Sequence, residues 1–102
     1  MTRIGDLIPD AARQLGLEDE LRLARAIATF EALVAERVPA AAGACRVIGI
    51  EGFWVDIEAD APIVAQELRL RSSELLTAFA AAPGGVGARE LRVHVRRTGP
   101  RV

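Results

Sequence analysis

The chain has 102 residues, of which 51% are hydrophobic and 26% are charged, and its formal net charge is −1. This length suits one domain with a single modest core, and the net charge taken alone argues against a nucleic-acid binder. The sequence has no apolar run of about 18 residues and no secretory signal, so we expect a cytoplasmic protein with no membrane partner. Cys45 is the single cysteine, which excludes an internal disulfide.

The first predicted element is a helix within Ile4–Leu15. Its apolar residues repeat at the i, i+3, i+4 spacing of one helix face. Gly16 is suited to end this helix as a C-cap residue. Pro9 favours a regular start near Ile8, because a proline deep inside a helix removes a hydrogen bond and clashes with the preceding turn.

A second helix is predicted from Glu18 to Arg37. Acidic residues at its beginning favour the positive end of the helix dipole, and Pro39 prevents its continuation. Its apolar face steps by four, three and four residues, through Leu23, Ile27, Phe30 and Val34. The small residues of 39–43 are expected to form a linker.

A β-hairpin is predicted next. Two apolar runs, Cys45–Ile50 and Phe53–Ile57, flank the pair Glu51-Gly52, which has the length of a tight turn. With a two-residue turn at Glu51-Gly52, one face of the two strands meets the helices and the other face is half polar. The first face holds Ile48, Ile50, Phe53, Val55 and Ile57, interrupted by Arg46, and the second holds Cys45, Val47, Gly49, Trp54, Asp56 and Glu58.

A third helix and a last strand complete the chain. Asp60 is predicted to cap a helix that has Pro62 in its first turn and runs to about Ala81. The glycine-rich residues 83–87 then form a flexible loop. Apolar and polar residues alternate from Leu91 to Arg96, which is typical of a half-buried strand.

The predicted order is helix, helix, strand, strand, helix, strand. It defines the fold class as α+β, a small two-layer domain whose three-stranded sheet carries helices on one face. We expect this domain to span residues 4–97 and to be followed by a frayed tail at residues 98–102.

Residues that could carry catalysis are sparse, so we expect no enzyme, no cofactor, no metal and no small-molecule substrate. His94 lies on the polar phase of its strand, and no nucleophile elbow occurs in the sequence. Asp56 and Glu58 share a strand face but lack the further ligands of a metal site. The G-x-x-G at Gly84–Gly87 follows a helix, whereas a phosphate-binding loop opens one.

Charged residues are distributed unevenly along the chain. Every one of the 13 basic residues is Arg, a side chain suited to bidentate contact with phosphate. Residues 51–61 hold four carboxylates and no Arg, whereas residues 89–101 hold five Arg and one Glu. The sequence therefore predicts a basic strand next to an acidic hairpin.

This basic strand is the candidate nucleic-acid site. Arg92 and Arg96 project from one strand face about 13 Å apart, at ~3.3 Å per residue, and Trp54 offers a ring on which a base could stack. The candidate nucleic-acid-binding residues are Arg89, Arg92, Arg96, Arg97 and Trp54. In the alternative, Arg92 and Arg96 pair with Asp56 and Glu58 across the sheet and bind nothing else.

A series of apolar and fixed positions resembles a known family. The series is Phe30-x-x-Leu33-Val34-Ala35, Gly52-Phe53-x-Val55-x-Ile57, Val64-Ala65-x-Glu67-Leu68, Leu75-Leu76 and Leu91-x-Val93-x-Val95-Arg96. It resembles the DciA family over nearly the whole chain, from about Ile4 to Arg97. The resemblance implies a KH-like α+β domain in a bacterial protein that assists loading of the replicative DNA helicase, binds nucleic acid and contacts the helicase.

Two functions follow as hypotheses. The first is a non-enzymatic replication accessory protein that binds single-stranded or double-stranded DNA weakly and electrostatically. The second is a protein-interaction module without DNA binding, which docks on the helicase or on a second copy through an exposed sheet edge.

Overall fold

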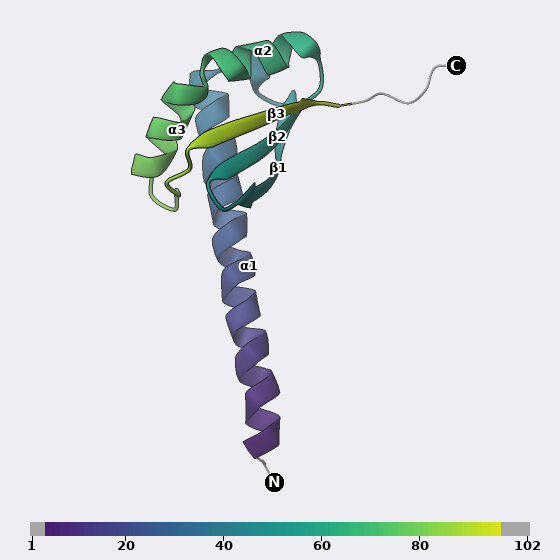
Figure 1. Cartoon of the computed structure of the whole chain (residues 1–102), viewed down its shortest axis with the longest axis vertical. Coiled ribbons are helices and arrows are strands. Elements are labelled where there is room, and N and C mark those ends of the chain that lie inside the picture. The colour runs from purple at the N-terminus through teal and green to yellow at the C-terminus, as the bar shows by residue number, and fades with distance from the viewer. Residues whose placement is uncertain (1–3, 97–102) are drawn as a thin grey trace, which may run out of the picture.

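The structure is a computed structural model that describes the backbone of residues 4–96 and the side chains of residues 16–96. Figure 1 shows a small sheet with one long helix that passes behind it and extends far beyond it, and two short helices above and to the left of the sheet. The elements are α1 (Ile4–Arg37), the 3-10 helix η1 (Pro39–Ala41), β1 (Cys45–Glu51), β2 (Trp54–Ala59), α2 (Pro62–Leu70), α3 (Ser72–Ala81) and β3 (Glu90–Val95). The predicted fold class and the order of helical and strand segments are confirmed.

α1 runs without interruption through the point at which two separate helices were predicted. Gly16 does not act as a C-cap, since the glycines with positive φ are Gly43, Gly52 and Gly84. The helix also begins before Ile8 and includes Pro9. At this position the proline removes only one hydrogen bond close to the helix end, a loss that the rest of a long helix can absorb. The predicted apolar face of residues 4–15 lies outside the described side chains.

The core forms where the C-terminal part of α1 packs against the sheet and α3, while α2 packs against β2 and β3. Its buried members are Ala26, Phe30, Val34, Val38, Ala41, Val47, Val55, Ile57, Ala59, Ala65, Leu68, Leu75 and Phe79. The rings of Phe30 and Phe79 meet edge to face with centroids 5.0 Å apart, a favourable aromatic geometry. Ala41 belongs to η1, so the segment predicted as a linker contributes to the core.

The sheet is mixed, with β2 in the centre, β1 antiparallel to it and β3 parallel to it. The predicted hairpin turn is wrong by one residue, because the turn residues are Gly52 and Phe53 and Glu51 pairs with Trp54, which shifts the pairing near the turn by two residues. Gly52 has φ +55° whereas Phe53 has no positive φ. A positive φ at the first central residue and a negative φ at the second are typical of a type II′ turn, in which glycine takes the first position.

A β-bulge at Ile48 accompanies this register. The pairs on either side are Arg46–Glu58, Val47–Ile57, Gly49–Asp56 and Ile50–Val55. Ile48 is the extra residue that no position of β2 faces. Ile48 and Phe53, which were predicted to meet the helices, are therefore 54% and 60% exposed, and Val47 is buried instead.

The helix predicted from Pro62 to Ala81 is divided into α2 and α3 at Arg71, whose backbone is not helical. Ser72 and Ser73 follow the break, and serine favours a helix start over a helix interior. The predicted Asp60 cap is absent, since the N-cap residue is Ala61 without a side-chain hydrogen bond. Asp60 instead accepts a hydrogen bond from Arg46 Nη2 at 2.9 Å.

β3 has the predicted alternation at Leu91 and Val93, which are half-buried between exposed polar residues, whereas Val95 is exposed. Side chains from the helices bond to both edges of the sheet. Arg69 Nη2 donates to the Val93 carbonyl at 3.1 Å, and Glu31 Oε2 accepts from the Val47 N–H at 3.0 Å. Such contacts reduce the capacity of an edge to pair with another strand. The predicted tail, residues 98–102, lies outside the described residues.

Candidate nucleic-acid interface

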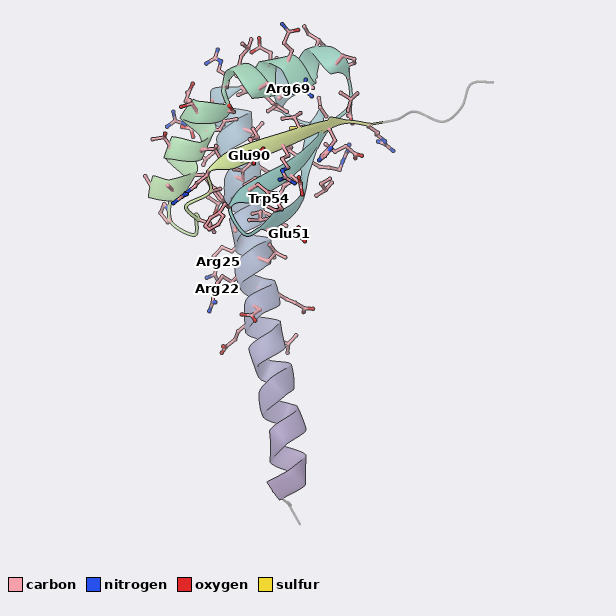
Figure 2. All side chains as sticks on the ribbon, in the orientation of Figure 1. Arg22, Arg25, Glu51, Trp54, Arg69 and Glu90 are labelled. Carbon is pink, nitrogen blue, oxygen red and sulfur yellow. The ribbon has the colours of Figure 1, made fainter. Side chains whose placement is uncertain are left out.

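The sheet face opposite the helices is uncovered, and Figure 2 shows Glu51, Trp54 and Glu90 on it. We call this surface the open face. It comprises Arg46, Glu51, Trp54, Asp56, Glu58, Glu90, Arg92 and His94, with Asp60 and Arg96 at its end. It therefore includes three of the five predicted binding residues.

Arg92 and Trp54 are in direct contact on the open face. The guanidinium carbon of Arg92 lies 3.7 Å from the centroid of the Trp54 ring, which is a close cation–π contact. Arg92 Nε also lies 3.7 Å from a carboxylate oxygen of Glu90. The guanidinium thus occupies the ring surface on which a nucleobase would stack, so a base reaches Trp54 only by displacing Arg92.

The alternative prediction paired Asp56 and Glu58 of β2 with Arg92 and Arg96. In the structure these carboxylates have other partners. Arg46 Nη1 donates to Glu58 at 2.6 Å, and His94 Nε2 lies 3.3 Å from Asp56 Oδ1. Hydrogen bonds to Asp60 and Glu58 raise the pKa of Arg46 further above its ordinary value. Asp56 and Glu58 are therefore engaged by His94 and Arg46 and not by the arginines of that alternative.

Arg96 also meets a carboxylate, since its Nη1 lies 4.0 Å from Asp60 Oδ1. Counted together, the open face holds five carboxylates against three Arg. Such a surface has no excess of positive charge with which to attract a phosphate backbone. Arg97 lies outside the described residues.

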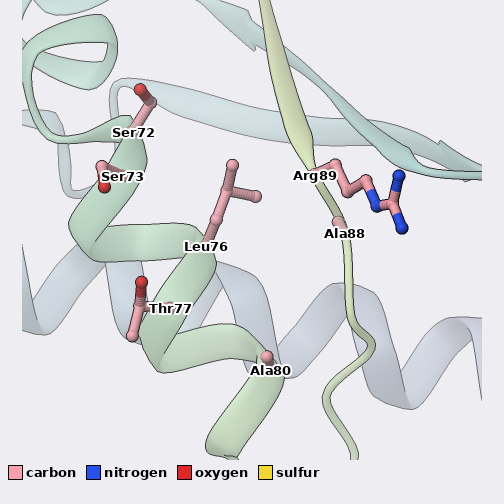
Figure 3. A pocket seen from close by; sticks show the side chains of 7 residues that line it. All are labelled: Ser72, Ser73, Leu76, Thr77, Ala80, Ala88 and Arg89. Carbon is pink, nitrogen blue, oxygen red and sulfur yellow. The ribbon is translucent and has the colours of Figure 1, made fainter.

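A second region lies between α3 and the start of β3, and we call it the α3–β3 hollow (Figure 3). Its volume is about 530 Å³, and its lining residues are Ser72, Ser73, Leu76, Thr77, Ala80, Ala88 and Arg89. Three hydroxyl groups and no carboxylate belong to this lining. Leu76 projects from the helix toward the strand, so the hollow combines an apolar side chain with polar hydroxyls (Figure 3).

Arg89 is the predicted binding residue that borders this hollow. Its guanidinium points away from α3 and lies 5.1 Å from the centroid of the exposed Phe53 ring (Figure 3). No salt bridge of Arg89 occurs within the described residues, whereas Arg92 and Arg96 each have one. Among the predicted arginines within the described part of the chain, Arg89 is therefore the one whose charge is least compensated.

The N-terminus of α3 opens beside the hollow. No side chain caps this helix, and the first backbone N–H that finds a carbonyl one turn back is that of Leu75, bonded to Arg71 at 2.9 Å. The N–H groups of Ser72 and Ser73 thus lack an intrahelical partner, and together with the helix dipole they favour an anion. Arg71 stands at this end and lies 3.4 Å from Glu74.

The sequence did not single out Ser72, Ser73 or Thr77. The predicted continuous helix placed them in mid-helix, where hydroxyls have no special role. The available signal was the Ser-Ser pair itself, because serine is common at helix starts. Ala88, another residue of the hollow, becomes relevant only because the fold brings β3 next to α3.

Neither metal nor thiol chemistry is supported by the described part of the chain. It contains no group of three His, Cys, Asp or Glu side chains that could hold a metal ion. The Cys45 thiol lies 3.4 Å from the Ala41 carbonyl, and burial raises the pKa of this thiol, which keeps it in its unreactive protonated form. No helix in residues 4–96 is long and apolar enough to cross a membrane.

These features define a small α+β domain with two distinct candidate surfaces. The chain matches the model of one protein family over residues 3–93, and that family is DciA, described as the Dna[CI] antecedent. Because the match covers most of the chain, the protein belongs to the DciA family, which is associated with loading of the replicative helicase. None of the curated proteins matches the chain.

Proposed function

We propose that this protein is a non-enzymatic accessory factor of DNA replication that assists helicase loading and binds single-stranded DNA weakly at the α3–β3 hollow. Family membership supports the replication role. The observation that carries the DNA-binding part is the composition of the hollow, which combines hydroxyls, a free helix N-terminus and no carboxylate in its lining. Phosphate oxygens accept hydrogen bonds from such donors.

The shape of the hollow favours one strand over a duplex. A gap between a helix and a strand admits an extended backbone with a single unstacked base, and Leu76, Ala80 and Ala88 offer that base an apolar surface. The phosphate on its outer side would meet the N–H groups of Ser72 and Ser73. Weak binding follows, because few cations are available to release counterions.

Arg92, Arg96 and Trp54 enter the proposal as a secondary contact. They lie on the open face, opposite α3, so a DNA strand that leaves the hollow reaches them only around the sheet edge formed by β3. Because Arg92 and Arg96 each meet a carboxylate, we expect each to contribute less than Arg89. Among these arginines, we therefore expect Arg89 to contribute most to DNA binding.

Fluorescence anisotropy with labelled single-stranded DNA tests this function. At ~50 mM salt we expect binding, with log K falling by about 0.7 per phosphate contacted for each unit of log salt. Arg89→Glu should weaken binding about tenfold, a loss of ~1.4 kcal/mol. The matched control is Arg22→Glu, since Arg22 is 77% exposed on α1 and distant from the hollow. No binding at this salt, or equal effects of both variants, would contradict the DNA-binding part.

A second candidate is a protein-interaction module that contacts the helicase and has no DNA affinity. The paired state of Arg46, Arg92 and Arg96 favours it, because arginines committed to carboxylates are not available to phosphates. Retention of the host's replicative helicase on the immobilised protein, together with absent anisotropy change, would select this function. DNA binding at the hollow would reject it.

A further inference from the structure

The N-terminal part of α1 stands apart from the rest of the molecule. α1 has 34 residues, and the longest axis of the molecule is 60 Å. Figure 1 shows the purple part of this helix extending away from the sheet and the other helices. Every residue from Gly16 to Arg25 is exposed, and the first buried residue is Ala26. A helix without tertiary packing is marginally stable in water, so a partner would stabilise it.

An apolar stripe runs along this exposed helix. Leu17, Leu21, Ala24 and Ala28 step by four, three and four residues, which is the seam spacing of paired helices. Leu17 and Leu21 are 52% and 63% exposed. At about 100° per residue, the stripe lies roughly 150° around the axis from the buried residues of α1. It therefore belongs to a face that the domain core leaves uncovered.

We propose that this stripe is the docking surface for a second copy of the chain, arranged as an antiparallel helix pair. In the register that places Leu21 against the partner's Ala24, Leu17 lies against the partner's Ala28. Each large side chain then meets a small one, which is the complementarity that close helix packing requires. A two-fold axis between the copies makes every contact occur twice.

Charge complementarity supports a second copy in this arrangement. Antiparallel pairing brings Glu18 next to the partner's Arg25 on one flank of the seam, and the two-fold axis repeats this pair. This contact joins opposite charges on neighbouring helices, which stabilises the antiparallel seam.

A surface hollow on the same flank fits this pairing. Its volume is about 350 Å³, and its lining residues are Glu18, Leu21, Arg22 and Arg25. The hollow thus provides space for the partner's Arg25 beside Glu18. An interface confined to one helix face is small, so we expect weak association that depends on protein concentration.

Sedimentation equilibrium from about 10 µM to about 1 mM tests the proposal, since this range covers weak association. The whole chain should pass from monomer to dimer. Leu21→Glu should remain monomeric throughout, because it buries two carboxylates in the seam. The control is Leu70→Glu, since Leu70 is 70% exposed on α2 and lies outside the stripe. Circular dichroism checks that both variants keep their helices.

Charge reversal tests the antiparallel register. Glu18→Arg and Arg25→Glu should each weaken the dimer about tenfold, because each creates two like-charge contacts. An equimolar mixture of the two variants should restore dimerisation, since every flank pair is then opposite in charge. A monomer at all concentrations, a dimer that survives Leu21→Glu, or a mixture that fails to associate would each overturn the proposal.

Discussion

The open face and the α3–β3 hollow differ in what surrounds their polar groups. On the open face, Arg46, Arg92 and Arg96 each lie near a carboxylate, and Arg92 also covers the Trp54 ring. In the hollow, hydroxyls and the start of a helix border a space with no carboxylate in its lining. A region rich in Arg can therefore have little charge available, whereas a region with one Arg can suit an anion better.

The largest expected effect concerns the core that supports both regions. Phe30→Ala removes a fully buried ring in edge-to-face contact with Phe79 of α3. We expect the free energy of unfolding to fall by about 3–5 kcal/mol, with loss of the hollow and of the open face together. Urea denaturation followed by circular dichroism measures this. The matched control, Leu21→Ala on exposed α1, should change the free energy of unfolding by less than about 0.5 kcal/mol.

A substitution at the start of α3 should change the stability of the fold and the affinity for DNA in opposite directions. Ser73→Asp places a carboxylate near the positive end of the helix dipole, which should stabilise the fold by about 0.3–1 kcal/mol. The same charge repels phosphate, so single-stranded DNA affinity should fall about tenfold. Thermal unfolding and anisotropy measure the two effects. Unchanged DNA affinity in a stabilised variant would place the DNA site elsewhere.

A smaller effect is expected on the open face. Arg92→Ala uncovers the Trp54 ring, and because Trp54 is the single tryptophan of the chain, its fluorescence reports on this face alone. Quenching by acrylamide should become about twofold stronger, by loss of the cation–π contact. DNA affinity should change by less than about threefold, since the Arg92 charge already meets Glu90. A tenfold loss of DNA affinity would instead make the open face the main binding surface.

Local sequence signals predicted the elements of this fold better than their register. The turn glycine, the alternation in β3 and the apolar steps of the second half of α1 each depend on neighbouring residues, and the structure confirms them except at Val95 and Leu23, which are exposed. The bulge at Ile48 depends on packing between α1 and the sheet, and one extra residue moves the residues before it to the other face. That shift exposed Ile48 and buried Val47.

The same distinction applies to the candidate site. The sequence identified Arg89, Arg92 and Trp54 as residues of interest, since their types suit nucleic acid. It did not reveal that Arg92 covers Trp54, because that contact joins positions 38 residues apart across parallel strands. The hollow depends on the break at Arg71 and on the approach of β3 to α3, neither of which has a strong local signal.

The most direct test of the central claim is a matched pair of charge reversals on β3 and the residue before it. Arg89→Glu borders the hollow and Arg92→Glu lies on the open face, so both make the same charge change three residues apart. Anisotropy with single-stranded DNA at ~50 mM salt should show at least a tenfold loss for Arg89→Glu and less than about a threefold loss for Arg92→Glu. The reverse order of effects would contradict the account.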